Sequence, residues 1–226
     1  MCRYNVSCIK GGVRAVLEKI SLQTLQRLPV YLELLRQDAA SDNISANRIA
    51  EELGLTEIQV RKDLAAVSDA GRPKKGFVVT DLIADLERAL GYDNADDAVL
   101  VGAGRLGRAL LSYAGFQRYG LNIVAGFDTN PRAWGQDEVS GKMIYAMDKL
   151  DDLCRRLSVH MGIITVPAPV AQCVCDELVG AGCRAIWNFA PTHIRAPGNI
   201  LIKNENMASS LALISHHLRR NLEEEA

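Results

Sequence analysis

The chain has 226 residues, enough for one large domain or two smaller ones, and we expect two unequal domains. Its 48% of hydrophobic residues is ordinary for a globular protein, and its formal net charge of −1 excludes a general attraction to nucleic acid or anionic membranes, so any such binding must come from a local patch. No apolar run approaches the length of about 18 residues that spans a bilayer, and no charged leader precedes an apolar segment, so we expect a cytoplasmic protein.

Residues 1–19 show no convincing periodicity before Val13, and we interpret them as an N-terminal extension. Ser21 is a good helix cap, and the leucines that follow it recur at helical spacing. They predict a first helix that Pro29 bends without ending.

Two short helices are predicted next. Ser45 is expected to cap a helix over 46–53 that Gly54 ends, and Thr56 to cap a second helix from Glu57 to about Val67. Two such helices joined by Gly-Leu-Thr are typical of a helix-turn-helix.

The second of these helices carries side chains suited to DNA. Gln and Arg near the start of a recognition helix reach adenine and guanine edges, and Lys suits a phosphate. A glycine-bounded basic turn over 71–76 and a short strand over 77–79 then resemble a wing. Residues 61–75 hold five basic and two acidic residues, which favours DNA binding over the alternative of an ordinary solvated three-helix module. The candidate DNA-binding residues are Gln59, Arg61, Lys62, Arg72, Lys74 and Lys75.

An amphipathic helix over 80–90 is expected to complete a winged-helix domain over 20–90. The Asp- and Asn-rich stretch 91–97 is the predicted linker to a second domain over 98–205.

The second domain opens on a glycine fingerprint. Gly102, Gly104 and Gly107 follow an apolar strand and open a predicted helix over 105–113, which is the dinucleotide-binding pattern in its expected setting. The glycines permit the tight turn, the approach of a pyrophosphate and close packing of helix on strand, and the phosphates would meet free N–H groups of the helix.

Strands and helices alternate after the fingerprint, which predicts a Rossmann-like α/β domain with a parallel sheet. Asp128 closes the second strand, 26 residues after Gly102, where an acid accepts hydrogen bonds from an adenosine ribose and favours NAD over NADP. Its alternative role is that of a turn residue. The predicted strands are 98–101, 121–127, 162–166 and 185–187, with 143–145 as a further candidate, and the predicted helices are 105–113, 149–157 and 170–181.

The sequence offers no convincing catalytic residue. A dehydrogenase needs a proton donor or acceptor near the nicotinamide, and the candidates His160, His193, His216, His217 and Tyr113 lack a recognisable partner. We therefore favour a sensor, with an NAD-dependent oxidoreductase and a CoA-binding module as alternatives, although Asp128 argues against CoA.

The six cysteines lack the paired spacing of a zinc site, so we expect no metal and mostly buried, reduced thiols. A thiol switch at Cys173 and Cys175 is the alternative, but two such close helical positions disfavour a disulfide.

The last segment, 206–226, is predicted to be a dimerisation helix and tail. Residues 207–218 form an apolar helix suited to a dimer contact or a domain-swapped arm, and the acidic run from Glu223 to Glu225 is expected to be a solvated tail.

Five collinear motifs resemble those of the Rex family of bacterial redox-sensing transcriptional repressors, from about Ile20 to Leu218. They are 24–32 (TLQRLPVYL), 59–64 (QVRKDL), 101–107 (VGAGRLG), 165–167 (TVP) and 188–191 (NFAP).

The resemblance implies a homodimer with a winged helix, a Rossmann domain and a swapped last helix, which binds a palindromic operator and is released by NADH. It also implies that the glycine turn holds the pyrophosphate and that Tyr113 and Pro167 lie near the nicotinamide. The candidate cofactor-binding residues are Gly102, Ala103, Gly104, Arg105, Leu106, Gly107, Tyr113, Asp128, Thr165, Val166 and Pro167.

Two positions depart from the family pattern. Glu33 stands where many members carry an arginine, and Asn206 where they carry an aspartate, and both family residues belong to the charge network of the switch. The basic wing also differs from the more usual Gly-Arg-Gly-Val-Gly-Tyr-like run. These departures predict a changed coupling between ligand and DNA and a changed operator preference.

Overall fold

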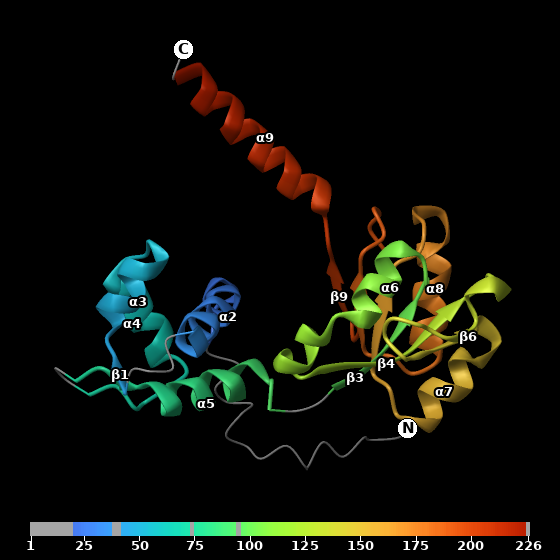
Figure 1. Cartoon of the computed structure of the whole chain (residues 1–226), viewed down its shortest axis with the longest axis horizontal. Helices are drawn as coiled ribbons and strands as arrows, with labels where there is room; N and C mark the ends of the chain where they lie inside the picture. Colours follow the sequence, from blue (N-terminus) through green and yellow to red (C-terminus); the bar gives the residue numbers. More distant parts are fainter. Residues whose placement is uncertain (1–19, 38–41, 73–74, 94–95, 225–226) are drawn as a thin grey trace. The chain divides into compact units, whose positions relative to one another are not determined.

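The computed structural model describes residues 20–37, 42–72, 75–93 and 96–224 (Figure 1). The N-terminal extension, Lys74, and residues 94–95 of the linker lie outside this part. The chain divides into two compact units between Asn94 and Ala95, and each is described by itself.

The described residues of the N-terminal unit form four helices and a two-stranded sheet. The helices are α2 (Leu22–Gln37), α3 (Ala46–Leu53), α4 (Glu57–Ala65) and α5 (Val79–Leu90). The expected caps are confirmed, since Ser45 accepts from the Arg48 N–H, Thr56 accepts from the Gln59 N–H, and Gly54 is left-handed with φ +63°. Helix α4 ends at Ala65, two residues before the expected end.

The wing is shorter at its strand than expected. β2 (Phe77–Val78) pairs antiparallel with β1 (Asn43–Ile44), and Val79 already belongs to α5. A two-residue strand is too short to show an alternating pattern, so β1 could not be predicted from the sequence.

The helices meet in one apolar core. Leu28, Leu32 and Leu35 of α2 are buried against α3, α4 and α5, whereas Leu22 and Leu25 are exposed. The first turn of α2 therefore presents apolar side chains that the described residues of the N-terminal unit leave exposed.

A buried carboxylate joins α4 to α2. Asp63 is 3% exposed and accepts hydrogen bonds from Arg27 Nε and Nη2 at 2.7 and 2.9 Å, from the Tyr31 hydroxyl at 2.8 Å and from the Thr24 hydroxyl at 2.9 Å. Burial alone would raise the pKa of Asp63, but these donors outweigh it and hold the pKa below its usual range. Burial and the bond to Asp63 raise the pKa of Tyr31 to about 12, so its hydroxyl remains a donor.

The C-terminal unit is built on a seven-stranded sheet of order β5-β6-β4-β3-β7-β8-β9, parallel except for β5. Such a sheet confirms the predicted Rossmann-like architecture. The strands are β3 (Asp96–Val101), β4 (Leu121–Asp128), β5 (Gly135–Gln136), β6 (Met143–Ala146), β7 (Met161–Ile164), β8 (Ala185–Asn188) and β9 (Leu201–Asn204).

Helices cover both faces of this sheet. α6 (Arg105–Ser112) packs through Leu111 into one apolar cluster, and α7 (Leu150–Arg156) and α8 (Ala168–Gly180) pack into the other. Short 3-10 turns cover 114–119, 131–133 and 147–149.

Several expected boundaries were wrong. β3 begins at Asp96, inside the expected linker, because it pairs with the whole start of β4 from Leu121. α6 ends at Ser112, so Tyr113 follows the helix instead of ending it. β7 ends at Ile164, which leaves Thr165 and Val166 in the loop beyond the strand.

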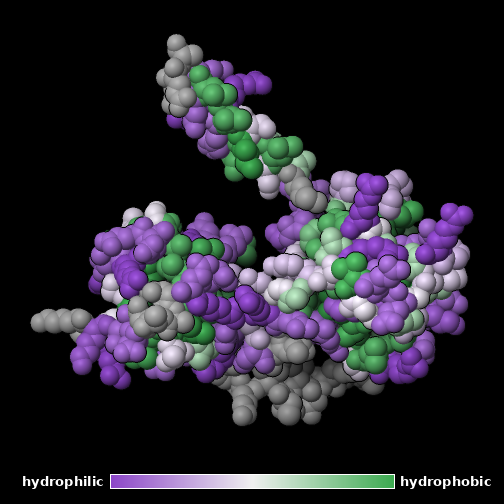
Figure 2. Space-filling view, in the orientation of Figure 1, coloured by the Kyte–Doolittle hydropathy of each residue, from purple (hydrophilic) through white to green (hydrophobic). Residues whose placement is uncertain are grey.

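Helix α9 (Met207–Glu224) is longer than expected and includes Glu223 and Glu224 of the expected acidic tail, of which Glu223 is exposed, whereas Glu225 lies outside the described residues. Leu211, Ile214, Leu218 and Leu222 are 57–64% exposed, and Figure 2 shows apolar surface along the helix. No helix within the described ranges is long and apolar enough to cross a membrane.

Asp63→Asn is expected to lower the free energy of unfolding of the N-terminal unit by about 2–4 kcal/mol at pH 7, because it leaves Arg27 without its charged partner. The stabilisation by the carboxylate is present above its unfolded-state pKa of about 3.9 and is lost as the pH falls through the lower folded pKa, so the difference between native and variant protein should shrink in acid.

Far-UV circular dichroism during urea unfolding measures this effect, whereas tryptophan fluorescence follows the C-terminal unit, which holds both tryptophans, Trp134 and Trp187. The exposed Asp69→Asn variant is the control and should change stability by no more than about 0.5 kcal/mol. Equal stability of Asp63→Asn and native protein at pH 7 would contradict the proposed anchoring.

Candidate functional site

The glycine turn after β3 is sterically fixed. Gly102 has φ +102°, and a Cβ there would lie 2.9 Å from the Thr165 carbonyl. A Cβ at Gly107 would lie 2.0 Å from the Gly102 oxygen, so α6 can pack against the turn only through glycine. At Gly104 no protein atom would lie within 4 Å, which leaves open space where the fingerprint expects a phosphate.

The start of α6 offers donors to an anion. Gly104 is the N-cap residue, and no side chain caps the helix. The N–H groups of its first turn therefore point out of the helix at its positive end. Arg105 and Leu106, both candidate cofactor residues, contribute backbone here, and their side chains are exposed.

Asp128 braces the turn as well as ending β4. Its Oδ2 accepts from the Ala103 N–H at 2.7 Å, and its Oδ1 accepts from the Asn130 N–H at 2.8 Å. Each carboxylate oxygen has a further lone pair, so the group can still accept from ribose hydroxyls. The structural role as a turn residue and the expected role toward a ribose are therefore compatible.

A cavity of about 400 Å³ lies beside this turn and brings most of the expected residues together. It runs from the end of β4 past the loop after β7 to one face of α8. Its lining residues are Val101, Gly102, Gly104, Asp128, Thr129, Met147, Thr165, Val166, Pro167, Val170, Cys173, Val174 and Glu177. The Thr165 hydroxyl lies 2.7 Å from the Gly102 oxygen and so ties the two loops.

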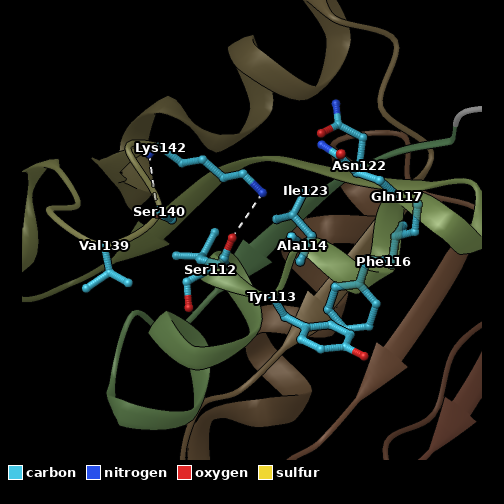
Figure 3. Close-up of a pocket in the computed structure, with 12 residues that line it drawn as sticks. Ser112, Tyr113, Ala114, Phe116, Gln117, Asn122, Ile123, Val139, Ser140 and Lys142 are labelled. Carbon is cyan, nitrogen blue, oxygen red and sulfur yellow. Dashed lines mark hydrogen bonds between the residues drawn. The ribbon is translucent and has the colours of Figure 1, made fainter.

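Tyr113 does not line this cavity. It borders a separate pocket of about 180 Å³, where its ring stacks edge-to-face on Phe116 with centroids 4.9 Å apart (Figure 3). Lys142, in the same pocket, donates to the Leu111 carbonyl at 3.0 Å, and burial lowers the pKa of this lysine. Within one copy of the chain, Tyr113 is thus not brought to the glycine turn.

Arg108 provides a second set of contacts that hold the glycine turn and that no sequence pattern predicts. Arg108 Nε donates to the Ala103 oxygen at 3.1 Å, and its Nη1 forms an ion pair with Asp137, which is 2% exposed. Hydrogen bonds from the side chain and backbone of Ser140 hold the pKa of Asp137 below its usual range. No spacing in the sequence links Arg108 to Asp137, which are 29 residues apart.

In the N-terminal unit, a hollow of about 740 Å³ lies between α4 and the wing. It gathers Arg61, Arg72 and Lys75, together with the acidic Glu57 and Asp69, while Gln59 and Lys62 do not line it. Arg61 forms an ion pair with Glu57, one turn earlier on α4. A nucleic-acid phosphate or base at this place would compete with Glu57 for this guanidinium.

The wing depends on one glycine. Gly76 has φ +75°, and a Cβ there would lie 2.2 Å from the Ile44 oxygen.

Asp63 anchors α4 and was missed as a site residue. Its position between Val60, Leu64 and Val67 on the apolar face of the helix is nevertheless a sequence signal of burial.

The remaining candidates have ordinary surroundings. His193 is exposed in the loop after β8 and does not line the cavity. Among the described cysteines, Cys154, Cys175 and Cys183 are buried and Cys173 is exposed, which agrees with the expectation of mostly buried thiols. No group of three or more potential metal-binding side chains occurs in the described ranges.

The two departures from the family pattern have local partners. The Glu33 carboxylate accepts from Gln37 Nε2 at 3.3 Å, and Asn206 Oδ1 accepts from the Ser209 N–H at 3.0 Å at the start of α9.

Comparisons with known proteins cover nearly the whole chain. A family described as "Putative DNA-binding protein N-terminus" matches residues 19–65, and one described as "CoA binding domain" matches residues 93–192. The redox-sensing transcriptional repressor Rex of Bacteroides fragilis is 39% identical over 206 residues, which are 90% of this chain and 93% of that protein.

Solved structures show the same relationship over both units of the chain. The crystal structure of RSP in complex with β-NAD⁺ and operator DNA has a TM-score of 0.84 at 30% identity and covers 91% of this chain and 95% of that one. RSP in complex with β-NADH has a TM-score of 0.81 at 30% identity and covers 92% and 98%. Since the sequence relationship extends over both units, this chain belongs to the Rex family of redox-sensing transcriptional repressors.

Proposed function

We propose that this chain is a DNA-binding transcriptional repressor that senses the NADH/NAD⁺ ratio and is released from its operator by NADH. The observation that carries the proposal is the presence, in one chain, of an anchored helix-turn-helix with a basic wing and of a cavity beside a preformed glycine turn. The structures of the relative RSP with NAD⁺ and operator DNA and with NADH support it.

The cavity is suited to NAD(H). Backbone N–H groups from 104 to 107 would receive the pyrophosphate, and Asp128, which already accepts from the Ala103 N–H, would accept from the adenosine ribose. A 2′-phosphate would meet the Asp128 carboxylate and be repelled, which favours NAD(H) over NADP(H). Thr165, Val166 and Pro167 form the wall after β7, at the carboxyl end of the strand.

DNA would bind across α4 and the wing. Gln59 and Arg61 are proposed to reach base edges in the major groove, and Lys62, Arg72, Lys74 and Lys75 to neutralise phosphates. Because Asp63 fixes α4 on α2, the reading side chains are held by a rigid support.

NADH can release the protein only if it binds the release-prone arrangement more tightly than the DNA-bound one. The output is a change of DNA affinity and not hydride transfer, so we propose that the chain is not an enzyme and acts in the cytoplasm, where the operator is. The oxidoreductase alternative would require turnover of the cofactor with a substrate.

Helix α9 is the proposed dimer element, swapped onto the partner subunit. Leu211, Ile214, Leu218 and Leu222 recur at i, i+3, i+7 and i+11 and form one apolar stripe. In proteins, most of the stability of such a helix comes from packing of its apolar face rather than from intrinsic propensity. Packing of the stripe on a second copy would supply the missing stabilisation and pair two recognition helices on a palindromic operator.

Asp128→Asn tests the sensor. In the native protein NADH should weaken binding to a palindromic duplex at fixed salt, whereas NAD⁺ and NADPH should not. The variant loses charge-assisted bonds to the ribose, so the NADH concentration that releases half of the DNA should rise about 10–100-fold. The preference of the protein for NADH over NADPH should also become smaller. Fluorescence anisotropy of labelled duplex measures both, and affinity without nucleotide is the control. If NADH leaves the DNA affinity of the native protein unchanged, the sensor is refuted.

Ile214→Glu tests the dimer. A carboxylate in the middle of the stripe should shift the chain toward monomer at micromolar concentration because burying an unpaired charge is costly. Leu213→Glu is the matched control: Leu213 is 60% exposed against 63% for Ile214, but lies off the stripe. Sedimentation velocity should show a dimer for native protein and Leu213→Glu. Equal dimerisation of both variants would exclude the stripe as the interface.

A further inference from the structure

One face of α8 forms a wall of the cavity. Val170, Cys173, Val174 and Glu177 are spaced i, i+3, i+4 and i+7, and all four line it. The helix starts beside Pro167 at the carboxyl end of β7, and Glu177 lies about 10 Å further along the helix axis than Val170. The cavity thus extends from the glycine turn along α8 to an acidic end.

In the proposed binding of NAD(H), this extension of the cavity would receive the adenine base. Asp128 at the end of β4 is placed to hold the adenosine ribose, and the surface beyond it toward α8 is mostly apolar. Met147, Val166, Val170 and Val174 supply this surface, which suits the flat faces of a purine. Glu177 and Cys173 are the polar side chains that α8 adds to it.

The Glu177 carboxylate is available to a ligand. In the described part of the chain its recorded partner is the Cys173 thiol, whose Sγ lies 3.5 Å from Oε1, and a thiol is a weak donor. The hydrogen bond to Glu177 raises the pKa of Cys173, so the thiol keeps its proton and continues to donate. The carboxylate therefore has lone pairs to offer and a neighbour that limits its rotation.

We propose that Glu177 accepts a hydrogen bond from the exocyclic amino group of adenine and makes the site selective for adenine dinucleotides. This inference rests on the proposed binding of NAD(H) in the cavity. Adenine carries a 6-amino donor, whereas hypoxanthine carries a carbonyl oxygen at the same position. A carboxylate attracts the first and repels the second.

The test compares dissociation constants for NADH and reduced nicotinamide hypoxanthine dinucleotide, measured by calorimetry on the full-length protein. Native protein should bind NADH about tenfold more tightly, the factor expected of one hydrogen bond to a charged group. Glu177→Gln should bind the two dinucleotides within about twofold, because an amide can turn its oxygen to an amino group or its nitrogen to a carbonyl.

Asp176→Asn is the matched control. Asp176 is the adjacent exposed acid on α8, accepts from Gln172 Nε2 at 2.9 Å and does not line the cavity. This variant should keep the tenfold preference. Equal binding of both dinucleotides by native protein, or an undiminished preference in Glu177→Gln, would overturn the role of Glu177. Failure of native protein to bind NADH at all would instead overturn the proposed function, and with it this inference.

Discussion

The close approach of α6 to the glycine turn is the constraint on which the nucleotide site depends. Because a Cβ at Gly107 would lie 2.0 Å from the Gly102 oxygen, helix and turn occupy one arrangement. Asp128 fixes that arrangement from β4 and Arg108 fixes it from α6, both through Ala103. The N–H groups at the start of α6 are thereby oriented before any ligand arrives, so binding does not have to order the turn.

In the N-terminal unit, a buried charge fixes the arrangement of α4 on α2. α4 is short and only weakly amphipathic. Its apolar contacts through Val60 and Leu64 therefore fix how closely the helix packs on the core, but fix its rotation about its own axis less well. The bidentate contact of Arg27 with Asp63 adds direction, and the hydroxyls of Tyr31 and Thr24 complete the coordination of the carboxylate. Rotation of α4 would break several of these bonds at once, which fixes the orientation of the side chains that we propose to contact DNA.

Local patterns allowed much of the fold to be predicted. The caps at Ser45 and Thr56 and the alternation of strands and helices are encoded within a few residues, and the structure agrees with them. The separation of Tyr113 from the cavity, the exposure of Cys173 and the pairing of Arg108 with Asp137 depend on how distant segments pack. Such contacts leave no periodic signal, so the residues that line the site could not all be predicted from the sequence.

The departures at Glu33 and Asn206 bear on how the two units communicate. The family residues at these positions are charged, whereas Asn206 carries no charge and Glu33 reverses the charge of an arginine. Asn206 retains the local role of capping α9 and Glu33 accepts from Gln37, so both substitutions preserve their own helices. A ligand shifts an equilibrium only through contacts that differ between the two states. In this chain an ion pair between positions 33 and 206 cannot supply such a difference, because Asn206 carries no charge.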